Sequence, residues 1–421
     1  MFIDSGNRRI RTNSQWLVFS LFITSVFISE LFFRDPLYNA SFNLIQYLQG
    51  NDPKNSSLVY AANIFSILGS KTTFIPIIFI VYNYANIYKT YILLMMLLVG
   101  FAETSILKMI YTSPRPFFDM SMVEIIGCTG SWGNPSGHTL KSMAFYLTLW
   151  HIVTDCKQLR EKKIIKNILL VFTVLFIICI MFSRVIVGAH GLNQILFGGL
   201  LGFANYFFIF YVLCLRLNDG KQFAKILNFT NIIHGIINFF IFLFAFLIYY
   251  FNEPNYLMPK YNEVINNKCP NVPMNERFQN EAIVQFAAFL ANIGAFIGIK
   301  FEYVFCFGEN LDNWNQYNFE SNEINDDSSL MTKITINRKT QWNHTNFFYS
   351  LIRLFLIALF SAVLVFPYFL FDWDDNIYLV FFLKLTVPAN TLTFACFFLF
   401  KVFMRSLRMV NMTFYSLNDS L

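Results

Sequence analysis

The chain has 421 residues, of which 56% are hydrophobic and only 13% are charged. A soluble domain carries roughly 25% charged residues, so this composition excludes an ordinary soluble protein. The net charge of +6 comes from basic residues spread along the chain rather than clustered with aromatic residues, so it gives no indication of a nucleic-acid partner.

Ten segments are long and apolar enough to cross a bilayer, which requires about 20 mostly apolar residues. We therefore expect an all-α polytopic membrane protein, a bundle of about ten transmembrane helices. The first two predicted spans are the weakest, because they are short or interrupted by Lys71. The predicted spans are 16–33, 62–84, 90–110, 137–154, 164–182, 192–215, 231–251, 282–307, 345–371 and 377–404.

The spans divide the chain into three predicted parts. Residues 1–57 would hold a cytoplasmic tail, an extra transmembrane helix and a non-cytosolic loop, and residues 58–215 a helical core with the candidate site. Residues 216–421 add further spans and a polar loop at 309–343, whose Asn, Asp and Ser content predicts flexibility. The proline-rich connection 252–281 is either a lid or simply a loop in which prolines end a helix.

Basic residues predict the orientation in the membrane, because they favour the cytoplasmic side of a span. With a cytoplasmic N-terminus, the candidate site falls at the non-cytosolic face, which is lumenal or extracellular. We expect the endoplasmic reticulum or another endomembrane, with the cell surface as the alternative. The basic segments are 7–13, 157–163, 216–225 and 405–408, and the acidic connection 372–375 falls on the opposite side.

Two cysteines, Cys128 and Cys269, lie in predicted non-cytosolic loops. An oxidising compartment would permit them to form a disulfide. Unpaired thiols are an equal alternative, so the pairing stays open at the level of sequence.

The first candidate motif is KMIYTSPRP, which runs from Lys108 at the end of a span to Pro116. Arg115 is flanked by two prolines that stiffen the backbone around it. Arginine offers a planar fork that suits two phosphate oxygens, and lysine offers a compact charge. Each cation alone would suggest an interfacial lysine or a solvated loop arginine, and only their spacing beside the next motifs favours an anion site.

The second motif is NPSGH, residues 134–138, at the start of a predicted helix. Ser136 can cap this helix, and Gly137 allows the backbone to approach an anion closely. The first amides of the helix then point at the anion. His138 is placed to protonate a leaving alkoxide.

The third motif is SRVIVGAHGLNQ, residues 183–194, which adds Arg184 and His190. A neutral imidazole at His190 can attack phosphorus while His138 supplies a proton. Gln194 lies one helical turn after His190 and can accept a hydrogen bond from the other ring nitrogen. A carboxylate would do this better than an amide, so we expect a somewhat less basic His190.

Together these residues match what hydrolysis of a phosphate monoester needs, because its transition state spreads charge over three oxygens and is stabilised mainly by positioning and electrostatics. We predict His190, His138 and Arg184 as catalytic residues and Gln194 as the residue that orients His190. Neither a metal nor a cofactor is predicted. The predicted phosphate ligands are Lys108, Arg115, Ser136, Gly137 and Arg184.

The three motifs resemble the signature motifs of the type 2 phosphatidic acid phosphatase superfamily. That group includes lipid phosphate phosphatases, sphingosine-phosphate phosphatases, glucose-6-phosphatase and vanadium haloperoxidases. The resemblance directly covers about 108–194 and implies a metal-independent phosphohistidine mechanism with the roles given above. The hydrophobicity of the chain argues against a haloperoxidase.

Gln194 departs from the aspartate that most members of the superfamily carry, and glucose-6-phosphatase is similar in having glutamine there. The run CTGSWGNPSGH from Cys128 is also similar to that enzyme, whereas the extra first span suits a lipid phosphatase. The expected partners are therefore membrane lipids and a phosphorylated lipid, with a sugar phosphate as a close alternative. A catalytically impaired scaffold or transporter is the second alternative. Protein partners stay open.

Overall fold

The structure is a computed structural model that describes residues 5–50, 52–53, 56–85, 87–126, 128–213, 231–252, 258–272, 277–306, 347–369 and 377–406. The described residues form helices, with one isolated β-bridge between Gly130 and Arg277. The helices are α1 (Ser5–Gln49), α2 (Ser57–Leu68), α3 (Lys71–Tyr84), α4 (Ile87–Tyr111), α5 (Pro116–Asp119), α6 (Gly137–Thr154), α7 (Lys157–Arg160), α8 (Lys163–Ile186), α9 (Leu192–Phe207), η2 (Phe208–Val212), α11 (Asn231–Phe251), α12 (Met258–Lys268), α13 (Phe278–Phe286), η4 (Ala287–Leu290), α14 (Ala291–Phe301), η5 (Glu302–Cys306), α16 (Phe347–Phe369), α17 (Ile377–Leu379), η6 (Val380–Thr386), α18 (Val387–Phe394), η7 (Ala395–Leu399) and α19 (Phe400–Ser406).

The chain is an all-α polytopic membrane protein. Among the described residues, seven helices are long and apolar enough to cross a bilayer, and the pair α2 and α3, bent by 45°, makes an eighth span. The remaining two predicted spans coincide with α6 and α16. α16 contains only a shorter apolar stretch, Leu351–Val365, and α6 carries several polar residues that serve the site. Each of the ten predicted spans thus coincides with described helices. By length and composition alone, seven of these spans qualify as membrane-crossing, or eight with the bent pair α2 and α3.

The outer surface of the bundle is apolar, as a bilayer requires. Large hydrophobic side chains on α1, α8 and α11, such as Leu31, Phe172 and Phe240, are exposed. Apolar surface of this extent on a soluble protein would be an aggregation hazard, whereas lipid chains cover it favourably. The polar and charged side chains of the candidate site lie inside the bundle instead.

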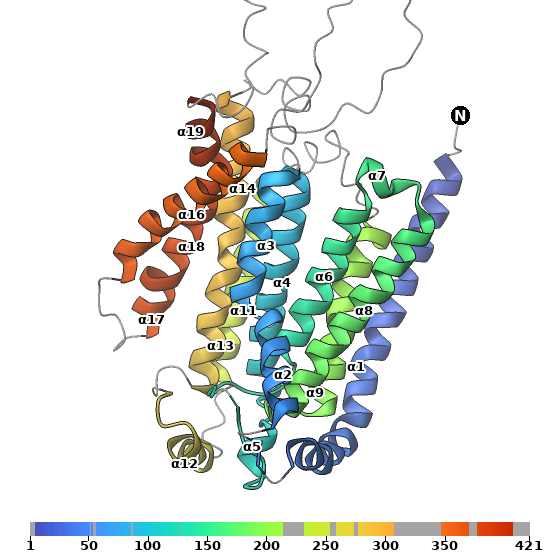
Figure 1. Ribbon diagram of the computed structural model, residues 1–421, viewed down its shortest axis with the longest axis vertical. Helices are drawn as coiled ribbons and strands as arrows, with labels where there is room; N and C mark the ends of the chain where they lie inside the picture. Colours follow the sequence, from blue (N-terminus) through green and yellow to red (C-terminus); the bar gives the residue numbers. More distant parts are fainter. Residues whose placement is uncertain are drawn as a thin grey trace, which may run out of the picture.

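Helix α6 occupies the middle of the part that holds the site. It packs against α4, α8 and α9, while α1 covers the outer side of α9 (Figure 1). Close packing depends on Gly198, where a β-carbon would lie 2.7 Å from the carbonyl oxygen of Ser136. The NPSGH turn is therefore held directly against α9, the helix that follows His190.

Helix α1 is longer than predicted. It continues from the predicted span through Gln49, so residues 34–49 are helical rather than the loop expected there. The helix contains Pro36, a residue that commonly kinks a helix, and the end of α1 turns across the site end of the bundle (Figure 1). There Ser41 Oγ accepts a hydrogen bond of 2.7 Å from the backbone N–H of Leu192, at the start of α9. The end of α1 therefore supports the turn that carries His190.

The predicted cytoplasmic segments that the structure describes lie at one end of the molecule. The N-terminus, α7 and the last helix α19 are at the top in Figure 1, and α5 and α12 are at the bottom. The described basic segments therefore share the end of the bundle away from α5 and α12. The basic loop 216–225, the polar loop 309–343 and the acidic connection 372–375 lie outside the described residues.

The described part of the connection after α11 packs against the loop that carries Cys128, Gly130 and Trp132. Cys128 and Cys269 form a disulfide, with Cα atoms 5.5 Å apart, which resolves the alternative that the sequence left open. Phe278 donates a backbone hydrogen bond of 3.0 Å to Gly130, and its ring lies 4.8 Å from that of Trp132. These contacts hold the described part of the connection, residues 258–272 and 277, against the site loop. We call this part the wall of the site.

Candidate active site

Lys108 and Arg115 meet at Ser131, which is not among the predicted site residues. Lys108 is in the last turn of α4, and Arg115 immediately precedes α5. Lys108 Nζ lies 2.8 Å from Ser131 Oγ, and Arg115 Nη2 lies 2.6 Å from the same oxygen. Arg115 Nε also donates to the carbonyl oxygen of Ser131 at 2.6 Å. Ser131 therefore holds the two cations side by side.

Arg115 also contacts the predicted nucleophile. Its Nη1 lies 3.2 Å from His190 Nε2 and donates to the carbonyl oxygen of Ala189 at 2.9 Å. His190 itself is only 2% exposed. The imidazole nitrogen that is needed for attack therefore faces the cations.

Gln194 determines which nitrogen of His190 carries the proton. Its Oε1 lies 3.1 Å from His190 Nδ1 and accepts the backbone N–H of Gly191 at 3.2 Å. Its Nε2 donates to the carbonyl oxygen of Pro114 at 2.8 Å. The backbone N–H of Gly191 can only donate, and the carbonyl oxygen of Pro114 can only accept. The orientation of the Gln194 amide is therefore fixed, and Oε1 accepts the Nδ1–H of His190. The lone pair of His190 is then on Nε2.

The environment of His190 keeps its imidazole neutral. Burial lowers the pKa of His190 well below its usual range, and the charges of nearby groups lower it further. A neutral imidazole is the nucleophilic form. The charges that act on His190, in decreasing order, are those of Arg115, Arg184, Lys108 and His138.

Arg184 reaches the same region from the last turn of α8. Its Nη1 donates a hydrogen bond to Ser66 Oγ on α2, and its carbonyl oxygen accepts the backbone N–H of His190 at 3.2 Å. Within the described part of the chain, the buried Nε of Arg184 has no hydrogen-bond partner. That N–H remains available to a ligand.

His138 is the second residue of α6, directly after Gly137. The turn before it is fixed by Ser136, whose backbone N–H donates to the carbonyl oxygen of Gln194 at 3.0 Å. On the other side, a β-carbon at Gly69, in the break between α2 and α3, would lie 3.6 Å from His138 Cδ2. His138 thus lies between the His190 motif and the bent span α2–α3.

Gly137 is close to α4 and to a lysine one turn further along α6 itself. A β-carbon there would lie 2.8 Å from Thr104 Cγ2 and 3.5 Å from Lys141 Nζ. The site end of α6 therefore has no room for a side chain at this position, as the motif predicts for a backbone that approaches an anion.

The three predicted cations are buried, and the nearest carboxylate charge acting on Lys108 and Arg115 among the described residues is that of Glu281, which forms no ion pair with them. Lys108 and Arg115 are each 3% exposed, Arg184 is 8% exposed, and none of them forms an ion pair with a described residue. A buried charge without any partner costs about 3–5 kcal/mol, and one carboxylate balances three cations only in part, so this arrangement favours a bound anion. The electrostatics and hydrogen bonds thus bring together all eight predicted site residues.

Comparison with protein families matches residues 88–218 to the PAP2 superfamily. The segment 88–218 is thus a domain of the PAP2, or type 2 phosphatidic acid phosphatase, superfamily. No curated protein and no solved structure matches the chain in the same comparisons. All eight predicted site residues lie inside the PAP2 segment 88–218, which begins with the second residue of α4.

Four contributing residues were not predicted from sequence, and three of them lie outside the PAP2 segment. Ser41 and Ser66 support Leu192 and Arg184, and Glu281 accepts hydrogen bonds from Thr129 Oγ1 and Gln285 Nε2. Single serines and a glutamate far from the motifs carry no spacing signal. Ser131 lies inside the run that begins at Cys128, but a serine there gives no indication that it bridges two cations.

Proposed function

We propose that this protein is an integral membrane phosphatase that hydrolyses phosphate monoesters through a phosphohistidine intermediate. The observation that supports this most is the position of His190 Nε2, which is unprotonated and 3.2 Å from Arg115 among three buried cations. A phosphoryl group bound by these cations would present its phosphorus to that nitrogen.

The first step follows from this arrangement. The lone pair of His190 Nε2 attacks phosphorus, the P–O bond of the ester breaks, and its electron pair stays on the leaving oxygen. His138 gives that oxygen a proton, so the alcohol leaves neutral. The charge of the transition state is stabilised by Lys108, Arg115 and Arg184 and by the first amides of α6.

The second step reverses the protonation roles. His138 removes a proton from a water molecule, whose oxygen attacks the phosphorus of phosphohistidine. The P–N bond breaks, its electron pair returns to His190 Nε2, and inorganic phosphate leaves. Gln194 Oε1 holds the Nδ1–H of His190 in both steps and stabilises the cationic imidazole of the intermediate. Neither step uses a metal ion.

A lipid phosphate is the proposed substrate class, and glucose 6-phosphate is the second candidate because of Gln194. Purified protein should release phosphate in the presence of a chelator, and a panel should compare sphingoid-base phosphate, phosphatidate, isoprenoid phosphate and glucose 6-phosphate. Orthovanadate should inhibit release, because it mimics five-coordinate phosphorus. Full turnover by His190→Ala would contradict the mechanism, and a protein without turnover or vanadate binding would be a scaffold or transporter instead.

We also propose that the site opens to the lumen or the extracellular space, in an endomembrane or at the cell surface. This rests on the basic residues at the opposite end of the bundle and on the disulfide beside the site, which requires an oxidising compartment.

A further inference from the structure

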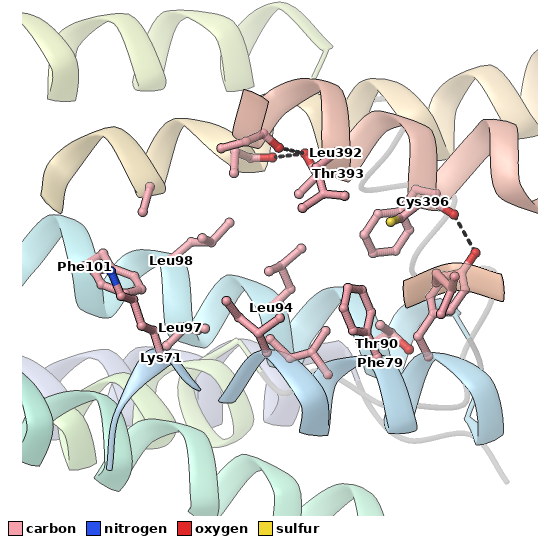
Figure 2. A pocket seen from close by; sticks show the side chains of 18 residues that line it. Lys71, Phe79, Thr90, Leu94, Leu97, Leu98, Phe101, Leu392, Thr393 and Cys396 are labelled. Carbon is pink, nitrogen blue, oxygen red and sulfur yellow. Dashed lines mark hydrogen bonds between the residues drawn. The ribbon is translucent and has the colours of Figure 1, made fainter. Parts of the chain in front are cut away.

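An apolar cavity of about 220 Å³ lies between α3, α4 and the C-terminal helices (Figure 2). Its walls come from α3 and α4 on one side and from η4, α14, α16, α18 and η7 on the other. The second group of helices lies outside the PAP2 segment, so the cavity combines both parts of the chain.

The lining of the cavity leaves few polar groups for a ligand. Among the lining residues, Lys71 alone is charged. The hydroxyl of Tyr82 donates to the carbonyl oxygen of Cys396 at 2.5 Å, and Thr393 Oγ1 donates to that of Ala291 at 2.8 Å. A sugar in this cavity would leave its hydroxyl groups without partners, which costs free energy, whereas a hydrocarbon chain loses nothing.

One end of the cavity approaches the site through Lys141 and through the break between α2 and α3. Figure 2 shows Lys71 beside Phe101 at this end. Lys141 Nζ lies 3.8 Å from the centre of the Phe101 ring and 3.5 Å from a β-carbon placed at Gly137. Lys71 also begins α3, immediately after the break at which Gly69 approaches His138. The cavity therefore begins on the His138 side of the site, where the proposed mechanism protonates the leaving oxygen.

The cavity has the length and direction of a lipid chain. It follows α4 from Phe101 back to Thr90, a distance of about 16 Å at the helical rise of 1.5 Å per residue. This is about half of the ~30 Å hydrocarbon core of a bilayer. Along α4 the cavity runs from the end near the site toward the start of the helix at Ile87.

We propose that this cavity binds the hydrocarbon chain of the substrate, so that the enzyme acts on long-chain lipid phosphates. The inference rests on the proposed phosphatase function and names the substrate class of the same site. The phosphate is bound by the PAP2 segment, and the chain by the cavity between α3, α4 and the C-terminal helices. Selectivity for chain length then comes in part from residues that the PAP2 segment does not contain.

The test compares a sixteen-carbon with a four-carbon alkyl phosphate, which share the phosphate and differ in the chain. Ala288→Phe fills the cavity, and Ala362→Phe adds the same side chain on an exposed position of α16. We expect Ala288→Phe to lower the ratio of kcat/KM for the long over the short substrate by tenfold or more, and Ala362→Phe to leave the ratio unchanged. An unchanged ratio in Ala288→Phe would overturn the cavity assignment, while phosphate release from no substrate would overturn the phosphatase function.

A second measurement is independent of turnover. A sixteen-carbon alkyl phosphonate with a photoreactive diazirine at the chain end should label peptides that contain Thr90 or Cys396, at the far end of the cavity. Excess orthovanadate should abolish this labelling, because it displaces the phosphonate from the cations. Labelling at other helices, or labelling that vanadate does not reduce, would overturn the proposal and indicate an adventitious bilayer lipid.

Discussion

Among single residues, two neutral side chains of the site determine the tautomer of His190 and the placement of Lys108 and Arg115. Gln194 fixes the proton of His190 on Nδ1, and Ser131 holds Lys108 beside Arg115. Neither residue would contact the reacting phosphorus itself. Their substitution therefore tests positioning rather than chemistry.

Gln194→Asp should move the acid limb of the pH profile to higher pH. The added carboxylate favours the imidazolium, so the pKa of His190 rises, and the neutral nucleophile is lost at a higher pH than before. The measurement is the pH dependence of kcat/KM, with Gln194→Asn as a neutral control of equal size. Ionisation of the substrate is the same for both variants, so coincident acid limbs would contradict this role for Gln194.

Ser131→Ala should weaken vanadate inhibition by about tenfold to a hundredfold, since hydrogen bonds to charged groups contribute roughly 1.5–3 kcal/mol. The inhibition constant of vanadate measures this. Ser105 offers a matched control, because its buried hydroxyl lies on α4 one turn before Lys108 and has no partner among the described residues. Equal constants for Ser131→Ala and Ser105→Ala would show that Ser131 does not organise the cations.

At the scale of elements, the motifs predicted helices better than they predicted connections. Helix α6 has the predicted bounds 137–154, because an apolar run directly follows the NPSGH turn. The extension of α1 was missed, because residues 34–49 are polar enough to be interpreted as a loop and contain Pro36. Their helical form is supported by distant partners such as Glu124 and Ile186, which bind Gln49. Sequence patterns carry no signal for contacts of this kind.

The wall formed by α12 should depend on its disulfide. Replacing Cys128 and Cys269 together by serine should lower the free energy of unfolding by about 2–4 kcal/mol, because the unfolded chain gains freedom. Thermal unfolding in detergent measures the loss, and Cys156→Ser, at a free cysteine, is the control. An equal number of reactive thiols before and after reduction would contradict the disulfide itself.

At the scale of the whole molecule, the orientation in the membrane connects the site to its compartment. Single cysteines introduced as Lys260→Cys, on α12, and Gln158→Cys, on α7, lie at opposite ends of the bundle. In a background without other reactive thiols, an impermeant maleimide should label Gln158→Cys from the cytosol. Lys260→Cys should react only from the lumenal or extracellular side. Labelling of both from one side would contradict the predicted orientation.

The central claim is that His190 carries the phosphoryl group during turnover. The most direct measurement is to incubate the protein with an alkyl phosphate whose phosphoryl group is isotopically labelled. The protein is then denatured rapidly, and the modified residue is identified by mass spectrometry. We predict a phosphohistidine at His190 that is absent from His190→Ala. Continued release of phosphate by His190→Ala, or label on another residue, would contradict it.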